Sequence, residues 1–242
     1  MNKPNMIIFD YGQTLVNEKT FDPFEGTRAV LKEAASNPDN VSAEEVQALA
    51  VQLNHEIGRY GVEFEKQTFL EVHNHIFRKY LYEYFGIEFT KSEAEIERIF
   101  IKAAFAAEPT KNIEKLLNFL ESTNIRTSVI SNISFSGNSL KERINDFIPS
   151  NKFEFILASS EYVFRKPHKR IFELALRKAK LSASDVWYCG DNAVFDVDGA
   201  SACGLFPVWY KGAIEKSNKH IPKSDCLIIN DWYELIDKLK TT

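Results

Sequence analysis

The chain has 242 residues, of which 44% are hydrophobic and 26% are charged, as is ordinary for a globular protein. A net charge of −4 gives no positive field for nucleic acid or an anionic membrane, and no apolar run approaches the roughly 18 residues of a membrane helix. The three cysteines (Cys189, Cys203 and Cys226) are an odd number without metal-like spacing, which argues against a disulfide framework. We expect a reduced, cytoplasmic monomer or homodimer with no nucleic-acid and no membrane partner.

The chain begins with a short apolar run, Met6 to Phe9, which predicts a strand buried on both faces. Asp10 ends this run, and Gly12 would let the backbone turn sharply and approach a ligand. Because an unpaired carboxylate is costly to bury, we expect Asp10 at the carboxyl end of the strand, where open α/β sheets bind ligands.

Between about residues 24 and 107 the hydrophobic pattern has the period of helices and almost no strand-like alternation. Four helices are predicted, over about residues 24–35, 43–57, 69–85 and from 91 to just before Pro109. Two capping boxes support them, Ser42 with Glu45 and Thr90 with Glu93. Four successive helices indicate a small bundle.

After Pro109 helices and strands alternate, which is typical of a parallel sheet covered by helices on both faces. The fold class is therefore α/β: a doubly wound, Rossmann-like parallel sheet with an inserted α-helical bundle. Residues 1–20 and 108–242 would form the core domain, and residues 21–107 the helical insert. The predicted strands cover residues 127–130, 153–158, 186–189, 205–210 and 226–229, and the predicted helices cover about 113–124, 140–147, 168–180, 195–202 and 232–239.

Polar clusters fall at or just after the ends of three later strands: Ser131-Asn132, Arg165-Lys166-Pro167 and Gly190-Asp191-Asn192. Asp196 follows five residues after Asp191. Each cluster alone is common in turns, caps or solvated loops. The carboxyl ends of parallel strands meet at one edge of a sheet, however, so the ordered set predicts a shared pocket. Its expected members are Asp10, Ser131, Lys166, Asp191 and Asp196.

The segments IIFDYGQTL, SVISN, RKP and CGDNAVFD resemble, in this order, the four motifs of the haloacid dehalogenase superfamily, a group dominated by magnesium-dependent phosphatases. A helical insert between the first and second motifs resembles the C1 cap of one subfamily. The resemblance covers the whole chain. It implies a Mg²⁺-dependent hydrolase that acts on a small phosphorylated metabolite.

By this resemblance Asp10 attacks phosphorus and becomes a phosphoaspartyl intermediate, which divides one displacement into two. An anionic nucleophile and an anionic substrate repel each other, so a cation has to lie between them. Mg²⁺ prefers oxygen ligands, here Asp10, the Gly12 carbonyl and Asp191. Asp196 would hold the metal through a water or orient its neighbours.

The resemblance also implies a set of groups that bind the phosphoryl oxygens. These are the Ser131 hydroxyl and the backbone N–H groups of Tyr11, Gly12 and Asn132. Lys166 would add positive charge beside the nucleophile and keep it ionised.

The sequence departs from the family pattern at Gly12, where phosphatases usually carry a second aspartate as general acid and base. Glycine has no side chain to transfer a proton, although its carbonyl can still bind metal. Losing a positioned acid/base typically costs about 10²–10⁴-fold in rate. Phosphate esters with poor alkoxide leaving groups should suffer most, and aryl or acyl phosphates least. We therefore expect weak turnover of alkyl phosphates.

Several alternatives accommodate this change. The cap could supply the acid or base through His55, Glu56, His73 or His75. Phosphonoacetaldehyde hydrolases share a small residue at this place and use a cap lysine, for which Lys19, Lys32, Lys66, Lys79, Lys91 and Lys102 are available. Metal-independent dehalogenases and a non-enzymatic module that binds a phosphorylated ligand are further alternatives. Substrate contacts could come from Arg28, Arg59 and Arg78 or from the tyrosines at 60, 80, 82 and 84, although the aromatic stripe favours bundle core.

Overall fold

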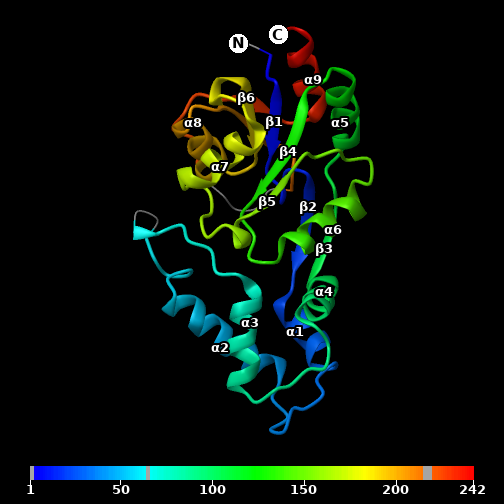
Figure 1. Ribbon diagram of the computed structural model, residues 1–242, viewed down its shortest axis with the longest axis vertical. Helices are drawn as coiled ribbons and strands as arrows, with labels where there is room; N and C mark the ends of the chain where they lie inside the picture. The colour runs from blue at the N-terminus through cyan, green and yellow to red at the C-terminus, as the bar shows by residue number, and fades with distance from the viewer. Residues whose placement is uncertain (1–2, 64–65, 215–219) are drawn as a thin grey trace.

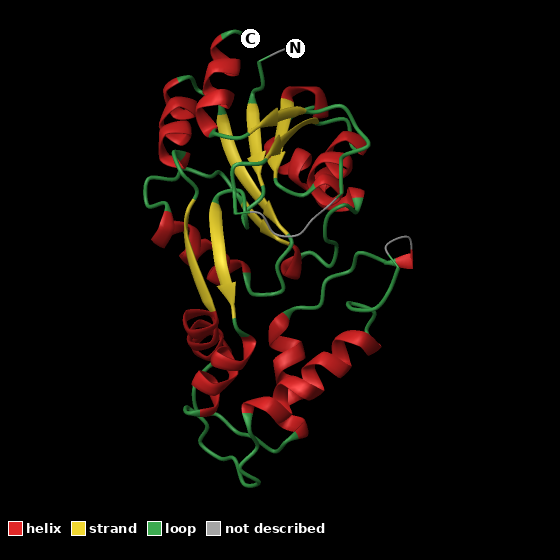
Figure 2. Cartoon of the chain, turned by 180° about the vertical axis from the view of Figure 1, so that it is seen from behind, coloured by secondary structure: helices red, strands yellow, loops and turns green. Residues whose placement is uncertain are grey.

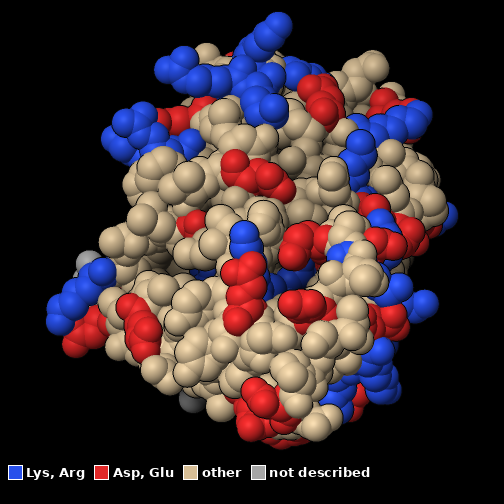
Figure 3. Space-filling view, turned by 60° about the horizontal axis from the view of Figure 1, so that its bottom comes forward, with Lys and Arg blue, Asp and Glu red and all other residues tan. Residues whose placement is uncertain are grey.

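The computed structural model describes residues 3–63, 66–214 and 220–242. A parallel sheet flanked by helices forms one end of the molecule, and a group of helices forms the other (Figure 1). Within these ranges no helix has the length and apolar character needed to cross a membrane. Basic and acidic side chains are interspersed over the face seen when the helical end is turned forward (Figure 3).

The sheet has six parallel strands in the order β5-β4-β1-β6-β7-β8, which confirms the predicted fold class. The chain builds outward from β1 to one side and then to the other, so β1 lies at the topological switch point. The strands are β1 (Met6–Phe9), β4 (Arg126–Ser131), β5 (Ile156–Ala158), β6 (Val186–Gly190), β7 (Phe206–Tyr210) and β8 (Leu227–Ile229).

Alternate side chains of β1 belong to two separate cores, one on each face of the sheet. Ile7 and Phe9 pack with α5, α6 and α9, whereas Met6 and Ile8 pack with α7 and α8. This burial on both faces explains why β1 is uniformly apolar. The helices are α5 (Ile113–Ser122), α6 (Gly137–Phe147), α7 (Lys169–Ala179), α8 (Gly199–Ala202) and α9 (Trp232–Lys240), with the short 3-10 helices η2 (Ser159–Glu161) and η3 (Ala183–Asp185).

An antiparallel ribbon of two strands, β2 (Val16–Phe21) and β3 (Phe105–Pro109), connects the sheet to the helical group (Figure 2). This ribbon was not predicted. Residues 105–108 were expected to lie in a helix that Pro109 would end, but Phe105 is already extended and Pro109 pairs with Val16. The ribbon joins segments almost ninety residues apart, and this long-range pairing is invisible to a local pattern.

In the described part of residues 21–107, four α-helices form the other end of the molecule, as expected: α1 (Pro23–Leu31), α2 (Ala43–Glu56), α3 (Asn74–Tyr84) and α4 (Glu93–Ala104). They share an apolar core of their own. The Ser42–Glu45 capping box is confirmed. The Thr90–Glu93 box is wrong: α4 begins two residues later than that pairing requires, and its box is formed by Ser92 and Glu95.

The aromatic stripe of α3 is only partly core. Tyr82 is buried, but Tyr80 and Tyr84 are exposed and stack on each other with ring centroids 6.1 Å apart. The helix also begins at Asn74 rather than near residue 69, because His73 caps it by accepting a hydrogen bond from the backbone N–H of His75.

Candidate functional site

A cavity of about 620 Å³ is lined by residues at the carboxyl ends of the sheet strands and by residues of the helical group. Its lining includes Arg59 and Arg78 from the helical side and the turn after β1 from the sheet side. All eight residues predicted from the sequence line this cavity: Asp10, Tyr11, Gly12, Ser131, Asn132, Lys166, Asp191 and Asp196.

The turn after β1 places the first carboxylate. The backbone N–H of Asp10 donates to the Cys189 carbonyl at 2.8 Å, so Asp10 continues the pairing of β1 with β6. In this turn the left-handed residue is Gln13, with φ of 58°, and not Gly12. The expectation that Gly12 serves the turn by its conformational freedom is therefore wrong. Because Gly12 has no side chain, it instead leaves space for a neighbouring side chain, that of Glu18.

A buried lysine lies at the centre of the site. The Lys166 ammonium donates to Asp10 Oδ1 at 2.6 Å, to Asp196 Oδ1 at 2.6 Å and to the Tyr188 hydroxyl at 2.8 Å, and the side chain is 2% exposed. The Asn132 side chain holds the lysine backbone by accepting from its N–H at 2.7 Å and donating to its carbonyl at 2.9 Å. Asn132 thus positions the lysine by way of its main chain.

Asp196 lies on a π-helical segment, η4 (Ala193–Asp198), rather than on the regular helix expected over 195–202. The Asn192 side chain caps this segment, and the Asn192 backbone N–H donates to Asp196 Oδ2 at 2.9 Å. A Cβ on Gly190 would lie 2.5 Å from Asp196 Oδ2, so only glycine leaves room for the carboxylate. Asp198, at the end of this segment, is half-buried and accepts hydrogen bonds from two backbone N–H groups.

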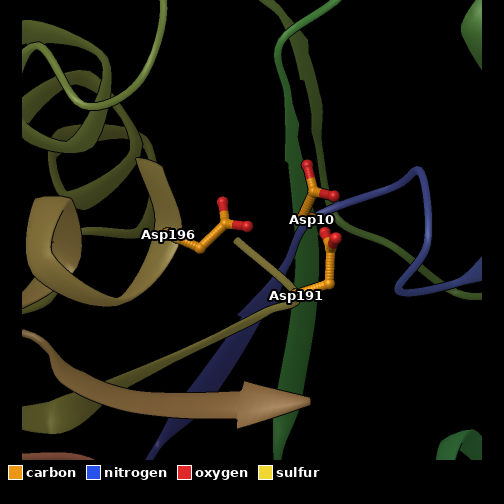
Figure 4. A group of neighbouring side chains, drawn as sticks. All are labelled: Asp10, Asp191 and Asp196. Atoms are coloured by element: carbon orange, nitrogen blue, oxygen red, sulfur yellow. The ribbon is translucent and has the colours of Figure 1, made fainter. Parts of the chain in front are cut away.

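Asp10, Asp191 and Asp196 form an acidic cluster in which one carboxylate oxygen from each lies within 4.8 Å of the others (Figure 4). Burial raises the pKa of Asp10 to about 7, against the opposing effect of Lys166 and with a contribution from Asp196. Burial followed by repulsion from Asp196 and Asp10 raises the pKa of Asp191 to about 8. Burial alone would lower the pKa of Lys166, but the Asp10 and Asp196 carboxylates outweigh it and raise that pKa.

The donor set fits a divalent cation. Three carboxylates face one ammonium, so two negative charges are left without a partner among these groups when all are ionised. Asp196 already accepts hydrogen bonds on both oxygens, from Lys166 and from the Asn192 backbone. Asp10 and Asp191 are therefore the carboxylates best placed to bind a metal directly, and hard oxygen ligands suit Mg²⁺.

Two residues at the site were missed from the sequence. The Tyr188 hydroxyl accepts a hydrogen bond from Lys166 and donates one to Asp196. Because Tyr188 lies within a buried strand, its sequence position indicated only a core residue. Glu18 of β2 lines the cavity, and its Oε1 accepts a hydrogen bond from Arg143 at 3.1 Å. No signal pointed to Glu18, because strand β2 itself was not predicted.

The residues of the helical insert that were expected to act as acid or base or to contact substrate differ in whether they line the cavity. Of those within the described ranges, none of the four acid/base candidates (His55, Glu56, His73 and His75) and none of the six lysines lines the cavity. Arg28 pairs with Glu44 on the surface. Of the candidate substrate-contact residues, Arg59, Tyr60, Arg78 and Tyr82 line the cavity.

Comparison with known proteins adds the following. The family described as haloacid dehalogenase-like hydrolase matches residues 7–209. A glyceraldehyde 3-phosphate phosphatase of Pyrococcus abyssi is 33% identical over 72 residues, which are 30% of this chain and 28% of that relative, so the match spans less than a third of the relative's length.

Solved structures share the fold. A 2-haloacid dehalogenase of Pseudomonas syringae is 20% identical, with a TM-score of 0.63 over 98% of this chain and 97% of that one. A phosphatase of the same superfamily from Thermococcus onnurineus is 16% identical, with a TM-score of 0.61 over 97% of each chain. At these identities the likeness concerns the fold alone.

Proposed function

The chain belongs to the haloacid dehalogenase-like hydrolase family, and on this basis we propose that it is a Mg²⁺-dependent phosphatase of a small phosphorylated metabolite. The observation that carries the proposal is the joint placement of Asp10, Lys166 and Asp191 beside one cavity at the topological switch point of the sheet. The partial similarity to a phosphatase supports the same reaction class.

In the first step Asp10 acts as the nucleophile. Lys166 holds its Oδ1 at 2.6 Å, whereas Oδ2 accepts a longer hydrogen bond, 3.5 Å, from the Thr14 hydroxyl and would attack phosphorus. The bond from Oδ2 to phosphorus forms as the bond to the leaving oxygen breaks, and the product is a phosphoaspartyl group on Asp10. In the second step water attacks phosphorus, inorganic phosphate leaves, and the carboxylate is regenerated.

Charge on the phosphoryl oxygens needs partners in both steps. The Ser131 hydroxyl, buried at the end of β4, and the backbone N–H groups of Tyr11, Gly12 and Asn132 would bind these oxygens. Mg²⁺, when bound by Asp10, the Gly12 carbonyl and Asp191, supplies positive charge between nucleophile and substrate. Lys166 adds a second, permanent positive charge beside Asp10.

Residues 21–107 would form a cap of the C1 type over a core of residues 1–20 and 108–242. The two strands of the β2–β3 ribbon run across both of these boundaries. Arg59 and Arg78 bring positive charge from the helical side to the cavity lining. The cap would therefore select the substrate, as segments over α/β sites commonly do.

The test is phosphate release from p-nitrophenyl phosphate and acetyl phosphate with Mg²⁺. We expect turnover by the parent protein and a loss of at least about 10³-fold in Asp10→Asn, because the amide is no nucleophile. Asp39→Asn makes the same change at an exposed loop position and should match the parent. Equal rates in Asp10→Asn and the parent would refute the assignment of Asp10 as the nucleophile. No turnover of either substrate would favour a non-enzymatic binding module.

The weakness on alkyl phosphates expected from Gly12 holds only if no other group delivers a proton to the leaving oxygen. The structure bears on this point directly.

A further inference from the structure

A carboxylate occupies the space beside Gly12. If residue 12 carried a Cβ, that atom would lie 3.2 Å from Oε2 and 3.6 Å from Cδ of Glu18. An aspartate at position 12 would extend its carboxyl carbon about 1.5 Å further from that point, a single C–C bond. The Glu18 carboxyl group of β2 therefore lies directly beside the space that a side chain at residue 12 would enter.

Local contacts hold Glu18 in this position. The register of β2 with β3 shifts between Glu18 and Thr20, and such irregularities redirect side chains next to functional sites. The Gln13 side chain donates to the Glu18 carbonyl at 3.0 Å, which ties the strand to the turn after Asp10. Arg143 donates to Glu18 Oε1 at 3.1 Å, so the oxygen near Gly12 is the other one, Oε2.

Arg143 is itself fixed. It is buried on α6, and its guanidinium lies 4.4 Å from the ring centroid of Phe105 and 5.4 Å from that of Tyr11. Its planar group is therefore held by packing before it contacts Glu18, which limits the freedom of the carboxylate. Arg143 is a positioning residue in this arrangement.

We propose that Glu18 is the general acid and base of this enzyme, in place of the side chain that Gly12 lacks. This inference rests on the proposed phosphatase function. In the first step the proton on Glu18 Oε2 moves to the leaving-group oxygen as its bond to phosphorus breaks and Asp10 Oδ2 bonds to phosphorus. In the second step the Glu18 carboxylate accepts a proton from the water that attacks phosphorus, and the bond from phosphorus to Asp10 breaks.

The competing role for Glu18 is structural, as the partner of Arg143. The two roles differ in their dependence on the leaving group. A missing acid slows poor leaving groups far more than good ones, whereas a displaced loop slows all substrates alike. The measurement is therefore kcat/KM, which covers the steps up to formation of the phosphoaspartyl group, across p-nitrophenyl, p-chlorophenyl and phenyl phosphates, for which the leaving group becomes steadily poorer.

Glu18→Gln keeps the shape and one oxygen for Arg143 but removes the transferable proton. We expect kcat/KM for phenyl phosphate to fall by about 10²-fold or more, and kcat/KM for p-nitrophenyl phosphate by less than about 10-fold. Glu108→Gln is the matched control: it lies on the partner strand β3, is exposed, and pairs with Lys19 outside the cavity lining. It should behave as the parent. A uniform loss over the series, or no loss, would overturn the role of Glu18.

A second variant tests the same idea by exchange. Gly12→Asp alone would place two carboxylates in contact, so phenyl phosphate turnover should not rise. Gly12→Asp combined with Glu18→Gln leaves one carboxylate in the same space, and the ratio of the phenyl to the p-nitrophenyl rate should recover at least about 10-fold over Glu18→Gln. A gain from Gly12→Asp alone, or no recovery in the double variant, would count against Glu18.

The failure of the proposed function would look different. If the parent releases no phosphate that depends on Asp10, the phosphatase assignment falls, and the role of Glu18 falls with it. If release depends on Asp10 but Glu18→Gln leaves the leaving-group dependence unchanged, only the inference about Glu18 is overturned.

Discussion

Lys166 offers the sharpest test of how this site is held together. Its ammonium lies 2.6 Å from two carboxylates, on Asp10 and Asp196, and almost no water reaches it. Lys166→Met keeps the length and apolar stem of the side chain but removes the charge. Breaking a buried ion pair from one side costs about 3–5 kcal/mol, because the remaining charge has no partner. For a chain of this size that corresponds to a fall in melting temperature of about 6–20 °C.

Lys19 supplies a matched control. It pairs with Glu108 at the same distance, 2.6 Å, but both side chains are about half exposed. Exposed pairs contribute about 0–1 kcal/mol, so Lys19→Met should leave the melting temperature nearly unchanged. The two variants make the same chemical change at equal ion-pair distance and differ chiefly in burial.

Urea denaturation in the presence of a chelator, followed by circular dichroism, gives the free energy of unfolding for the parent and both variants. Lowering the pH should reduce the difference in free energy of unfolding between Lys166→Met and the parent. Without the lysine the buried carboxylates hold protons in the folded state, so acid stabilises that state relative to the unfolded one. If the free energies of unfolding of Lys166→Met and Lys19→Met agree to within about 1 kcal/mol, the view that Lys166 compensates buried carboxylates is refuted.

Four further outcomes are expected. Gly190→Ala should cost about 1–3 kcal/mol in urea denaturation, because its Cβ would lie 2.5 Å from Oδ2 of Asp196 and displace it. Asn132→Ala should cost about 1–3 kcal/mol in the same assay and slow phosphate release, since it removes both side-chain hydrogen bonds to the Lys166 backbone. Mg²⁺ at about 100 times its dissociation constant should add about 2.7 kcal/mol to the free energy of unfolding, and Asp191→Asn should abolish this gain in calorimetry. With a chelator present, stability should instead fall as the pH rises from about 4 to about 8, because burial raises the pKa of Asp191 to about 8 and the folded chain keeps a proton that the unfolded chain releases.

Much of the fold was accessible from the sequence because the sheet strands are buried on both faces. Met6 to Phe9 contact two cores, so every position is apolar and the strand is visible as a continuous run. The polar residues after such runs must lie at the strand ends, which is why Asp10 and Asp191 could be assigned to one edge of the sheet. The helices could be predicted because their hydrophobic residues recur at helical spacing.

The β2–β3 ribbon was not accessible, for a physical reason. Residues Val16 to Phe21 carry mixed polar side chains, most of them exposed toward the strand's end, so no periodic signal marks them. They are a strand because residues 105–109 pair with them, and a single sequence does not display that pairing. Glu18 was missed for this reason.

At position 12 the absence of a side chain was noticed, but it was explained wrongly. The glycine was attributed to the conformation of the turn, but the left-handed residue of that turn is Gln13. The lack of a side chain instead leaves room for a carboxylate from another strand. Sequence shows that a group is missing at position 12; only the packing shows what fills the space.

The source of that carboxylate changes how the site is assembled. An aspartate at residue 12 would share one short turn with Asp10, so local geometry alone would fix the two groups. Glu18 lies on the strand that leads directly into α1, and its partner Arg143 comes from α6. The distance between nucleophile and acid then depends on the pairing of β2 with β3, and so on how the helical group is placed against the sheet. In this chain the helical group and the proposed proton donor are connected through one ribbon.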